Sequence, residues 1–143
     1  NKNIILLIIG EGSLKKKLQN KINKLQLQNN ILLVGNVSNI EYFYQNSSLY
    51  VCSSKWEGLS NVLIEASFNN LPIVSVHKLS GLDLILDNYK YGLILKNISA
   101  EDLLHAVKLG LNKKIKIPPI EYLKKTFDPK VSINKIISHI NVK

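Results

Sequence analysis

The sequence predicts an α/β fold built on a doubly wound parallel sheet. Short aliphatic runs alternate along the chain with segments in which apolar residues recur at helical spacing. Most aliphatic runs end in a small loop of glycine and polar residues, as parallel strands do where they lead into a crossover helix. The chain has 143 residues, enough for one buried core, so we expect a single domain over residues 1–143.

The first strand–helix–strand unit is the clearest. An aliphatic strand is expected over Asn3–Ile9, followed by a tight turn at Gly10–Ser13. Apolar residues then recur at helical spacing over Leu14–Leu25, and lysines occupy the other faces of this helix. Two asparagines break the pattern, and Ile31–Val34 is expected to form the second strand.

The middle of the chain repeats this order around a polar loop. A short helix carrying Ile40, Tyr42 and Phe43 leads to a third strand at Leu49–Cys52. The polar loop Ser53–Gly58 follows it. A helical pattern then precedes a fourth strand at residues 73–76; its apolar residues are Val62, Leu63, Ala66 and Phe68.

The last third of the chain is expected to continue the alternation. A short helix at Leu82–Leu86 precedes a strand at Leu93–Leu95, and Ser99 has the position of an N-cap for the helix that follows. Pro119 is expected in the first turn of a helix that runs through residue 125. Asp128 caps a last helix, whose apolar face is formed by Val131, Ile133, Ile136, Ile137 and Ile140.

The net charge of +9 comes entirely from lysine, because the sequence contains no arginine. The lysines concentrate over residues 15–24 and 108–135. They fit the solvated faces of helices, and attraction to an anionic membrane surface stays open as an alternative. Nucleic acid is disfavoured, since nucleic-acid surfaces usually combine arginine and aromatic residues with the lysines.

Other features of the sequence limit where in the cell the protein can work. A single cysteine, Cys52, excludes a disulfide framework and fits a small apolar core residue in a reducing cytoplasm. The longest aliphatic run, Ile4–Ile9, is far too short to cross a bilayer, and we expect neither a transmembrane helix nor a signal peptide. The chain begins at Asn1 directly before a strand, so we expect a fragment of a longer protein.

Ligands of an open α/β sheet bind beyond the carboxyl ends of the strands. Four loops are expected there: Gly10–Ser13, Gly35–Asn39, Ser53–Ser60 and His77–Gly81. The first, with Gly10 and Gly12, fits either a plain tight turn or a loop that lines a ligand. The third glycine of a dinucleotide fingerprint would fall at Lys15, so this signal is weak by itself.

The loop that contains Glu57 carries a stronger signal. The backbone N–H groups of Leu59, Ser60 and Asn61 arrive at a helix N-terminus, which favours an anion such as phosphate. Glu57 would repel phosphate unless it faces a neutral, hydroxyl-rich group, and Glu65 on the helix suits a vicinal diol, because a carboxylate accepts two hydroxyl hydrogen bonds. This arrangement predicts a phosphate flanked by two polyols.

The segment Trp56–Ala66, with Asn70–Val74 after it, resembles the signature of the family 4 (group 1) retaining glycosyltransferases, in which two glutamates are separated by seven residues. Further matches occur in the family's order and spacing at Ile8–Ser13, Val34–Val37, Ser80–Gly81 and Tyr91–Ile94. The resemblance implies the C-terminal, donor-binding, Rossmann-like half of a GT-B fold. It extends to about Leu111.

The resemblance also implies roles for individual residues. Glu65 would bind the ribose hydroxyls of a nucleotide sugar, and Glu57 would be the catalytic residue that faces the donor sugar. The amides of Leu59, Ser60 and Asn61 would hold the distal phosphate. The remaining site residues would come from two other loops, where Val37 and Asn39 would meet the base and Gly10 and Gly12 would line the donor.

The implied enzyme transfers a hexosyl group, with a UDP-sugar as expected donor, to a surface polysaccharide or glycolipid. It needs no metal and no other cofactor, and it would work in the cytoplasm or at the inner face of the membrane. The family's cationic clamp and N-terminal acceptor domain lie outside this chain, so we expect the chain alone to be inactive. The alternatives are a nucleotide-sugar 2-epimerase and a non-catalytic module that binds a nucleotide, a membrane or a partner. Trp56 is expected to pack beside the site, with stacking on a base as the alternative.

Overall fold

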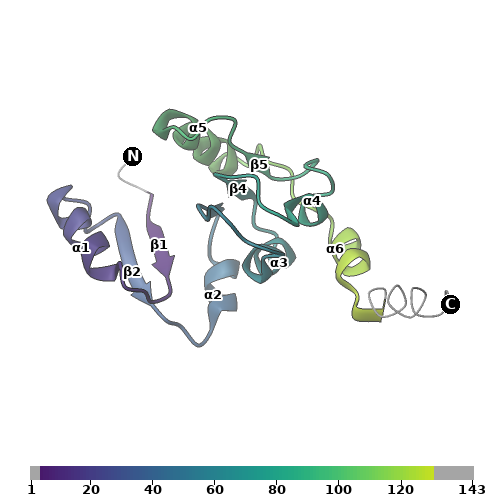
Figure 1. Ribbon diagram of the computed structural model, residues 1–143, viewed down its shortest axis with the longest axis horizontal. Coiled ribbons are helices and arrows are strands. Elements are labelled where there is room, and N and C mark those ends of the chain that lie inside the picture. Colours follow the sequence, from purple (N-terminus) through teal and green to yellow (C-terminus); the bar gives the residue numbers. More distant parts are fainter. Residues whose placement is uncertain (1–3, 131–143) are drawn as a thin grey trace. The chain divides into compact units, whose positions relative to one another are not determined.

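A computed structural model describes residues 4–130 of the chain (Figure 1). The contacts within it group into two compact units, Asn1–Ile40 and Glu41–Lys143, and each unit is described by itself. The expectation of one domain over residues 1–143 stays a prediction.

The first unit is a parallel strand pair with one crossover helix. Strands β1 (Leu6–Ile9) and β2 (Ile31–Gly35) pair in parallel, and Leu6 lies opposite Ile31. Helix α1 (Lys15–Lys24) connects them and buries Ile22. The amide of Asn30 donates to the carbonyl of Ile4 over 2.9 Å, which ties the start of β2 to the segment before β1.

The second unit contains a three-stranded parallel sheet in the order β3-β4-β5. Its strands are β3 (Tyr50–Cys52), β4 (Ile73–Ser75) and β5 (Leu93–Ile94). Its helices are α2 (Ile40–Gln45), which begins at the last residue of the first unit, α3 (Asn61–Phe68), α4 (Leu82–Ile85), α5 (Ala100–Leu111) and α6 (Ile120–Phe127).

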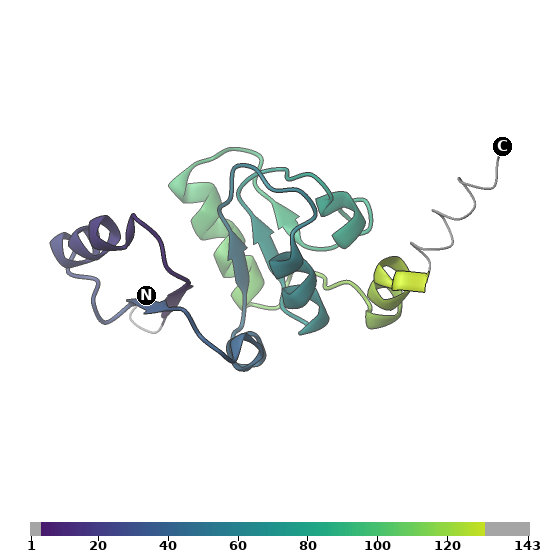
Figure 2. The ribbon, with the colours of Figure 1, turned by 60° about the horizontal axis from the view of Figure 1, so that its bottom comes forward.

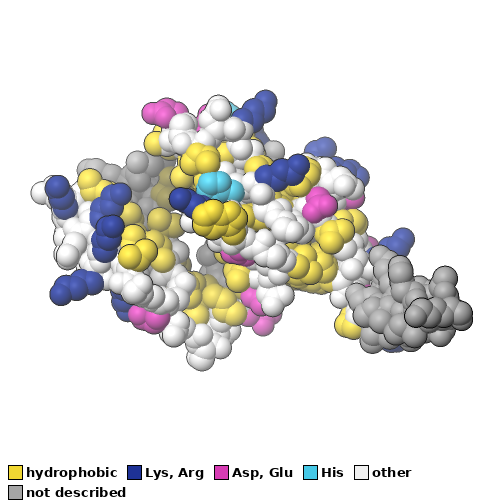
Figure 3. Space-filling view, viewed as in Figure 1, with side chains coloured by type: hydrophobic (Ala, Val, Ile, Leu, Met, Phe, Trp, Pro, Cys, Tyr) yellow, Lys and Arg dark blue, Asp and Glu magenta, His cyan; other side chains and the backbone are white. Residues whose placement is uncertain are grey.

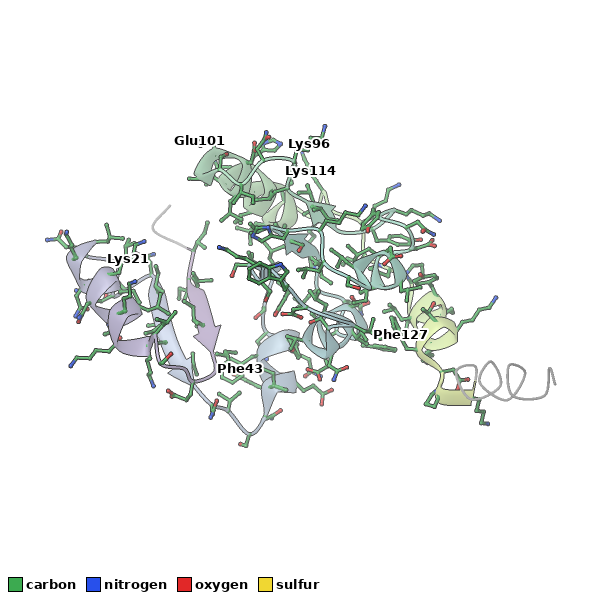
Figure 4. The ribbon with its side chains drawn as sticks, viewed as in Figure 1. Lys21, Phe43, Lys96, Glu101, Lys114 and Phe127 are labelled. Carbon is green, nitrogen blue, oxygen red and sulfur yellow. The ribbon has the colours of Figure 1, made fainter. Side chains whose placement is uncertain are left out.

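Alternate residues of these strands face two separate apolar clusters, as the period of two requires. On one face, a cluster of buried residues joins the sheet to α3 and α4; it contains Cys52, Leu63, Ile73, Leu79, Leu82, Ile85 and Leu86. Phe127 of α6 packs against this cluster (Figure 4). On the other face, Val74, Ala106 and Ile115 join the sheet to α5. Helices therefore cover both faces of the second sheet (Figure 2).

The predicted α/β class with parallel sheets is confirmed, and all five strands described lie inside or within one residue of their expected ranges. Cys52 is 4% exposed, as expected of a core residue. Ser99 is the N-cap of α5, since its hydroxyl accepts the N–H of Asp102 over 3.0 Å. The Asp128 carboxylate accepts the N–H of Lys130 over 2.8 Å, and the rest of the predicted last helix lies outside the described residues.

Within residues 4–130, no helix has the length and apolar character needed to cross a membrane.

Candidate functional site

Glu57 lies in the loop that joins β3 to α3, and two serine hydroxyls hold it there. The Ser54 hydroxyl donates to Glu57 Oε1 over 2.6 Å, the short distance typical of a hydrogen bond to a charged acceptor. The hydrogen bonds from Ser54 and Ser60 hold the pKa of Glu57 below its usual value of 4.5, against a smaller opposing effect of burial. Glu57 is therefore ionised at neutral pH.

The N-terminus of α3 follows directly. Ser60 occupies the N-cap position, is 7% exposed and has an extended backbone, but its hydroxyl makes no cap hydrogen bond to the helix. Its carbonyl accepts the N–H of Ile64 over 3.1 Å, so the helix begins here. Ser60 bonds Glu57 instead, so its hydroxyl caps none of the first N–H groups of α3. Unpaired backbone N–H groups at a helix N-terminus can bind an anion, and here they lie beside an ionised carboxylate.

The loop after β4 supports this helix end. Gly81 has a φ of +73°, and a Cβ added to it would lie 3.0 Å from Leu59 Cδ1 and 3.3 Å from Leu59 Cα. Only glycine combines that left-handed backbone with so close an approach. The position of Leu59 therefore depends on the loop that ends at Gly81.

Glu65 projects from α3 and is exposed, yet one of its oxygens is held by a buried side chain. The hydroxyl of Tyr44 on α2 donates to Glu65 Oε2 over 3.1 Å. Tyr44 is 6% exposed, and burial, followed by the bond to Glu65 and its negative charge, raises the pKa of Tyr44 far above its ordinary value of 10. Tyr44 was not among the residues expected at the site.

The electrostatics of Tyr50 link the two glutamates. Burial raises the pKa of Tyr50 to about 12, with further contributions from Cys52, Glu57 and Glu65 in that order. Both carboxylates thus act on the hydroxyl of Tyr50, the first residue of β3. The structure therefore brings together five of the predicted site residues in the second unit, namely Glu57, Leu59, Ser60, Asn61 and Glu65.

The other predicted site residues belong to the first unit. Gly10 has a φ of +119°, and its N–H donates to the carbonyl of Gly35 over 2.7 Å, which fixes the turn after β1. Glu11 in the same turn pairs with Lys15 over 2.6 Å. Gly12 follows in that turn, and Val37 and Asn39 lie in the loop after β2. Their placement near Glu57 stays a prediction.

The expectation that Trp56 packs beside the site is wrong. The side chain of Trp56 is 87% exposed, although its neighbour Glu57 is held by hydrogen bonds.

A cavity of about 570 Å³ lies at the opposite, amino-terminal edge of the second sheet. Residues that precede β3 and β4 line it, together with Lys113 and others that follow α5. Two of its polar side chains are already engaged in helix-end bonds, because the Ser47 hydroxyl donates to the Phe43 carbonyl and the Asn69 amide donates to the Glu65 carbonyl. The predicted ligand loops lie at the carboxyl edge, so we place the site there and not in this cavity.

Charge is mixed over the face shown in Figure 3, where lysines, carboxylates and apolar side chains are interspersed. One local excess occurs at the carboxyl end of α5 and in the segment after it. We call it the α5 lysine cluster: its four lysines are exposed and pair with no carboxylate of the described chain, and they are Lys108, Lys113, Lys114 and Lys116. Among residues 4–130, no three His, Cys, Asp or Glu side chains gather in a way that could hold a metal ion.

Comparison with known proteins assigns the family. The sequence matches the family described as "Glycosyl transferases group 1" over residues 1–125. An uncharacterized glycosyltransferase of Methanocaldococcus jannaschii is 52% identical over 73 residues, which are 51% of this chain and 18% of that protein. Poly(ribitol-phosphate) alpha-N-acetylglucosaminyltransferase of Staphylococcus aureus is 29% identical over 109 residues, 76% of this chain and 22% of that protein.

Solved structures agree. The crystal structure of TarM is similar to this chain, with a TM-score of 0.79 and 25% identity. The superposition covers 96% of this chain and 28% of the TarM chain. A mutant of S. aureus TarM in complex with fondaparinux, alpha-GlcNAc-glycerol and UDP superposes on 99% of this chain and 30% of its own, with a TM-score of 0.77 and 25% identity. The chain thus spans less than a third of the length of these relatives. It belongs to the group 1 glycosyltransferases.

Proposed function

We propose that this chain is the donor-binding, C-terminal half of a family 4 retaining glycosyltransferase. The longer enzyme would transfer a hexosyl group from a nucleotide sugar, with UDP as the nucleotide, to a surface polysaccharide or glycolipid. The names of similar proteins support this class: one relative is a poly(ribitol-phosphate) alpha-N-acetylglucosaminyltransferase, and another is the amylovoran biosynthesis glycosyltransferase AmsD of Erwinia amylovora, 37% identical over 70 residues. The TarM mutant was solved with UDP.

One observation carries the proposal: Glu57 lies just before the N-terminus of α3, Glu65 lies in the second turn of the same helix, and each carboxylate accepts a hydrogen bond from a buried or partly buried hydroxyl. The helix end suits the distal phosphate, which would be bound by the amides of Leu59, Ser60 and Asn61. Glu65 would accept the ribose hydroxyls through Oε1, because Oε2 already accepts from Tyr44.

Glu57 would face the donor sugar. Its serine hydrogen bonds keep it anionic, so it can accept sugar hydroxyls and stabilise positive charge that develops at the anomeric carbon. A carboxylate beside the phosphate site would also repel a misplaced diphosphate. Val37 and Asn39 would meet the base, and Gly10 and Gly12 would line the donor from the first unit.

The departing diphosphate needs cationic support that would come from outside the chain, as would the acceptor site. We therefore expect this chain to bind the donor weakly and to transfer no sugar by itself, and we expect binding to need no metal. Closure of two domains over the donor would complete the site in the longer enzyme.

Calorimetry with UDP tests the donor site. The chain should bind UDP, in buffer with EDTA as well as with magnesium, and Glu65→Gln should weaken binding about tenfold, since a hydrogen bond to a charged group contributes about 1.5 kcal/mol or more. Glu121→Gln on α6 is the matched control, because Glu121 is also an exposed helix glutamate. Equal affinities for the wild type and Glu65→Gln would contradict the assignment of Glu65.

The α5 lysine cluster favours a second element of function, attachment to an anionic membrane surface at the inner face of the membrane. Each lysine near such a surface contributes about 1 kcal/mol. Four lysines that pair with no carboxylate within residues 4–130 are enough for weak, salt-sensitive attachment, which would hold the enzyme at the membrane that carries a lipid-linked acceptor.

A further inference from the structure

The contact between Tyr44 and Glu65 joins two helices that lie far apart in the sequence. Tyr44 belongs to α2 and Glu65 to α3, and β3 and the Glu57 loop separate them. The Tyr44 hydroxyl nevertheless reaches Glu65 Oε2 at 3.1 Å. A side chain with 6% exposure thus bonds the exposed residue that the proposed function assigns to the ribose.

The packing of Tyr44 fixes the direction of this bond. Its ring contacts that of Tyr50 on β3, with centroids 6.4 Å apart and planes inclined by 56°. The strand therefore orients the tyrosine, and a buried ring has few alternative rotamers. Burial and the nearby carboxylate keep the hydroxyl protonated, so it acts as a hydrogen-bond donor at neutral pH.

Glu65 has no comparable restraint of its own. It is a long, exposed side chain on a helix surface and would lose rotamer freedom on binding a diol. The bond to Oε2 removes much of that freedom beforehand, and no residue among 4–130 bonds the other oxygen, Oε1. A carboxylate held by one oxygen, with the other unoccupied, is preorganised for a hydroxyl ligand.

We propose that Tyr44 is a positioning residue that aims Glu65 at the two ribose hydroxyls of the nucleotide. The proposal rests on the proposed function of Glu65. It makes the preference for a ribose diol depend on a tyrosine that does not itself touch the ligand. A purely structural role for the same bond would stabilise the fold without affecting which nucleotide is bound.

The test compares two tyrosine variants with two nucleotides. Tyr44→Phe removes the hydroxyl and keeps the ring. Tyr122→Phe is the matched control, because the Tyr122 hydroxyl on α6 also donates one hydrogen bond, to the Leu84 carbonyl of α4 over 2.6 Å, and does not bond Glu65. Calorimetry measures the Kd of the chain and of each variant for UDP and for 2′,3′-dideoxy-UDP.

We expect Tyr44→Phe to weaken UDP binding about fivefold, the effect of one hydrogen bond, and to leave the dideoxy nucleotide unchanged. Tyr122→Phe should change neither affinity. In the double variant with Glu65→Gln, the loss of Tyr44 should add nothing further, because both changes remove the same interaction. Equal weakening for both nucleotides, or none for UDP, would overturn the proposal.

The outcomes also distinguish the role of Tyr44 from the proposed binding of the ribose by Glu65. If the wild type binds UDP and its dideoxy analogue equally, Glu65 is not a ribose anchor, and both proposals fail. If Glu65→Gln abolishes the diol preference and Tyr44→Phe keeps it, only the role of Tyr44 fails. A measurement by NMR needs no ligand: Glu65→Gln should change the chemical shift of the Tyr44 Cζ carbon, which carries the hydroxyl, and an unchanged shift would disprove the contact.

Discussion

Gly81 is the position where a single methyl group should disturb both stability and ligand binding. Its backbone is left-handed, with a φ of +73°, and it lies against Leu59 at the start of α4. In Gly81→Ala the new Cβ would lie 3.0 Å from Leu59 Cδ1, a side-chain atom that can move, and 3.3 Å from Leu59 Cα, which is backbone. The variant must therefore shift one of the two loops.

The expected destabilisation has two parts. A left-handed conformation costs a non-glycine residue about 1–2 kcal/mol, and relief of the contact with Leu59 adds about 1 kcal/mol of small-to-large strain. We expect a total loss of about 2–3 kcal/mol in the free energy of unfolding. The displaced Leu59 amide should also weaken UDP binding, since that amide is assigned to the phosphate.

Gly58→Ala is the matched control in the neighbouring loop. Its φ lies outside the left-handed region, and a Cβ there would meet no atom within 4 Å. Urea unfolding followed by far-UV circular dichroism should place Gly58→Ala within about 1 kcal/mol of the wild type. Equal stability of Gly81→Ala and Gly58→Ala would refute the packing between the two loops, and unchanged UDP affinity in Gly81→Ala would refute the role of the Leu59 amide.

Two further predictions follow from charge. Ser54→Ala should raise the pKa of Glu57 toward 4.5, which NMR of the side-chain carboxyl carbon measures, and should destabilise the chain by about 0.5–1 kcal/mol at pH 7, a value reduced for solvent screening. Because the folded-state pKa of Glu57 is lowered, the stabilisation exists above pH 4.5 and disappears as the pH falls through the lowered pKa. The free energies of unfolding of the wild type and Ser54→Ala should therefore converge in acid. A difference that stays constant with pH would contradict this prediction. Vesicles with anionic lipid should retain the chain at low salt and release it at about 0.5 M salt. Replacing the lysines of the α5 lysine cluster with glutamine should abolish this retention. Retention by neutral vesicles would argue against an electrostatic surface.

The sequence was sufficient for the order of elements because its local signals agree with one another. The aliphatic run before Gly10 forms a parallel strand, and so do the apolar runs at β3 and β4. The hydroxyl of Ser99 caps α5 as its position predicts. The pair Glu57 and Glu65 was found because its spacing across one loop and one helix is itself a local pattern.

What the sequence did not reveal depends on contacts between distant segments. Tyr44 lies 21 residues before Glu65, and an aromatic residue in a short helix predicts only burial. Trp56 is exposed, and it lies in a loop, where no periodicity indicates which side chains are buried. The motif includes Glu65, but the buried hydroxyl that holds it becomes visible only when α2 and α3 are packed together.

We propose that the N-terminal end of α3, which begins between Glu57 and Glu65, binds the nucleotide diphosphate. Amide chemical shifts of the labelled chain during a UDP titration test it most directly. We expect the largest shifts at Leu59, Ser60 and Asn61, with a smaller shift at Glu65. Shifts confined to the cavity at the amino-terminal edge, near Asn70 and Lys113, with residues 57–65 unmoved at millimolar UDP, would contradict it.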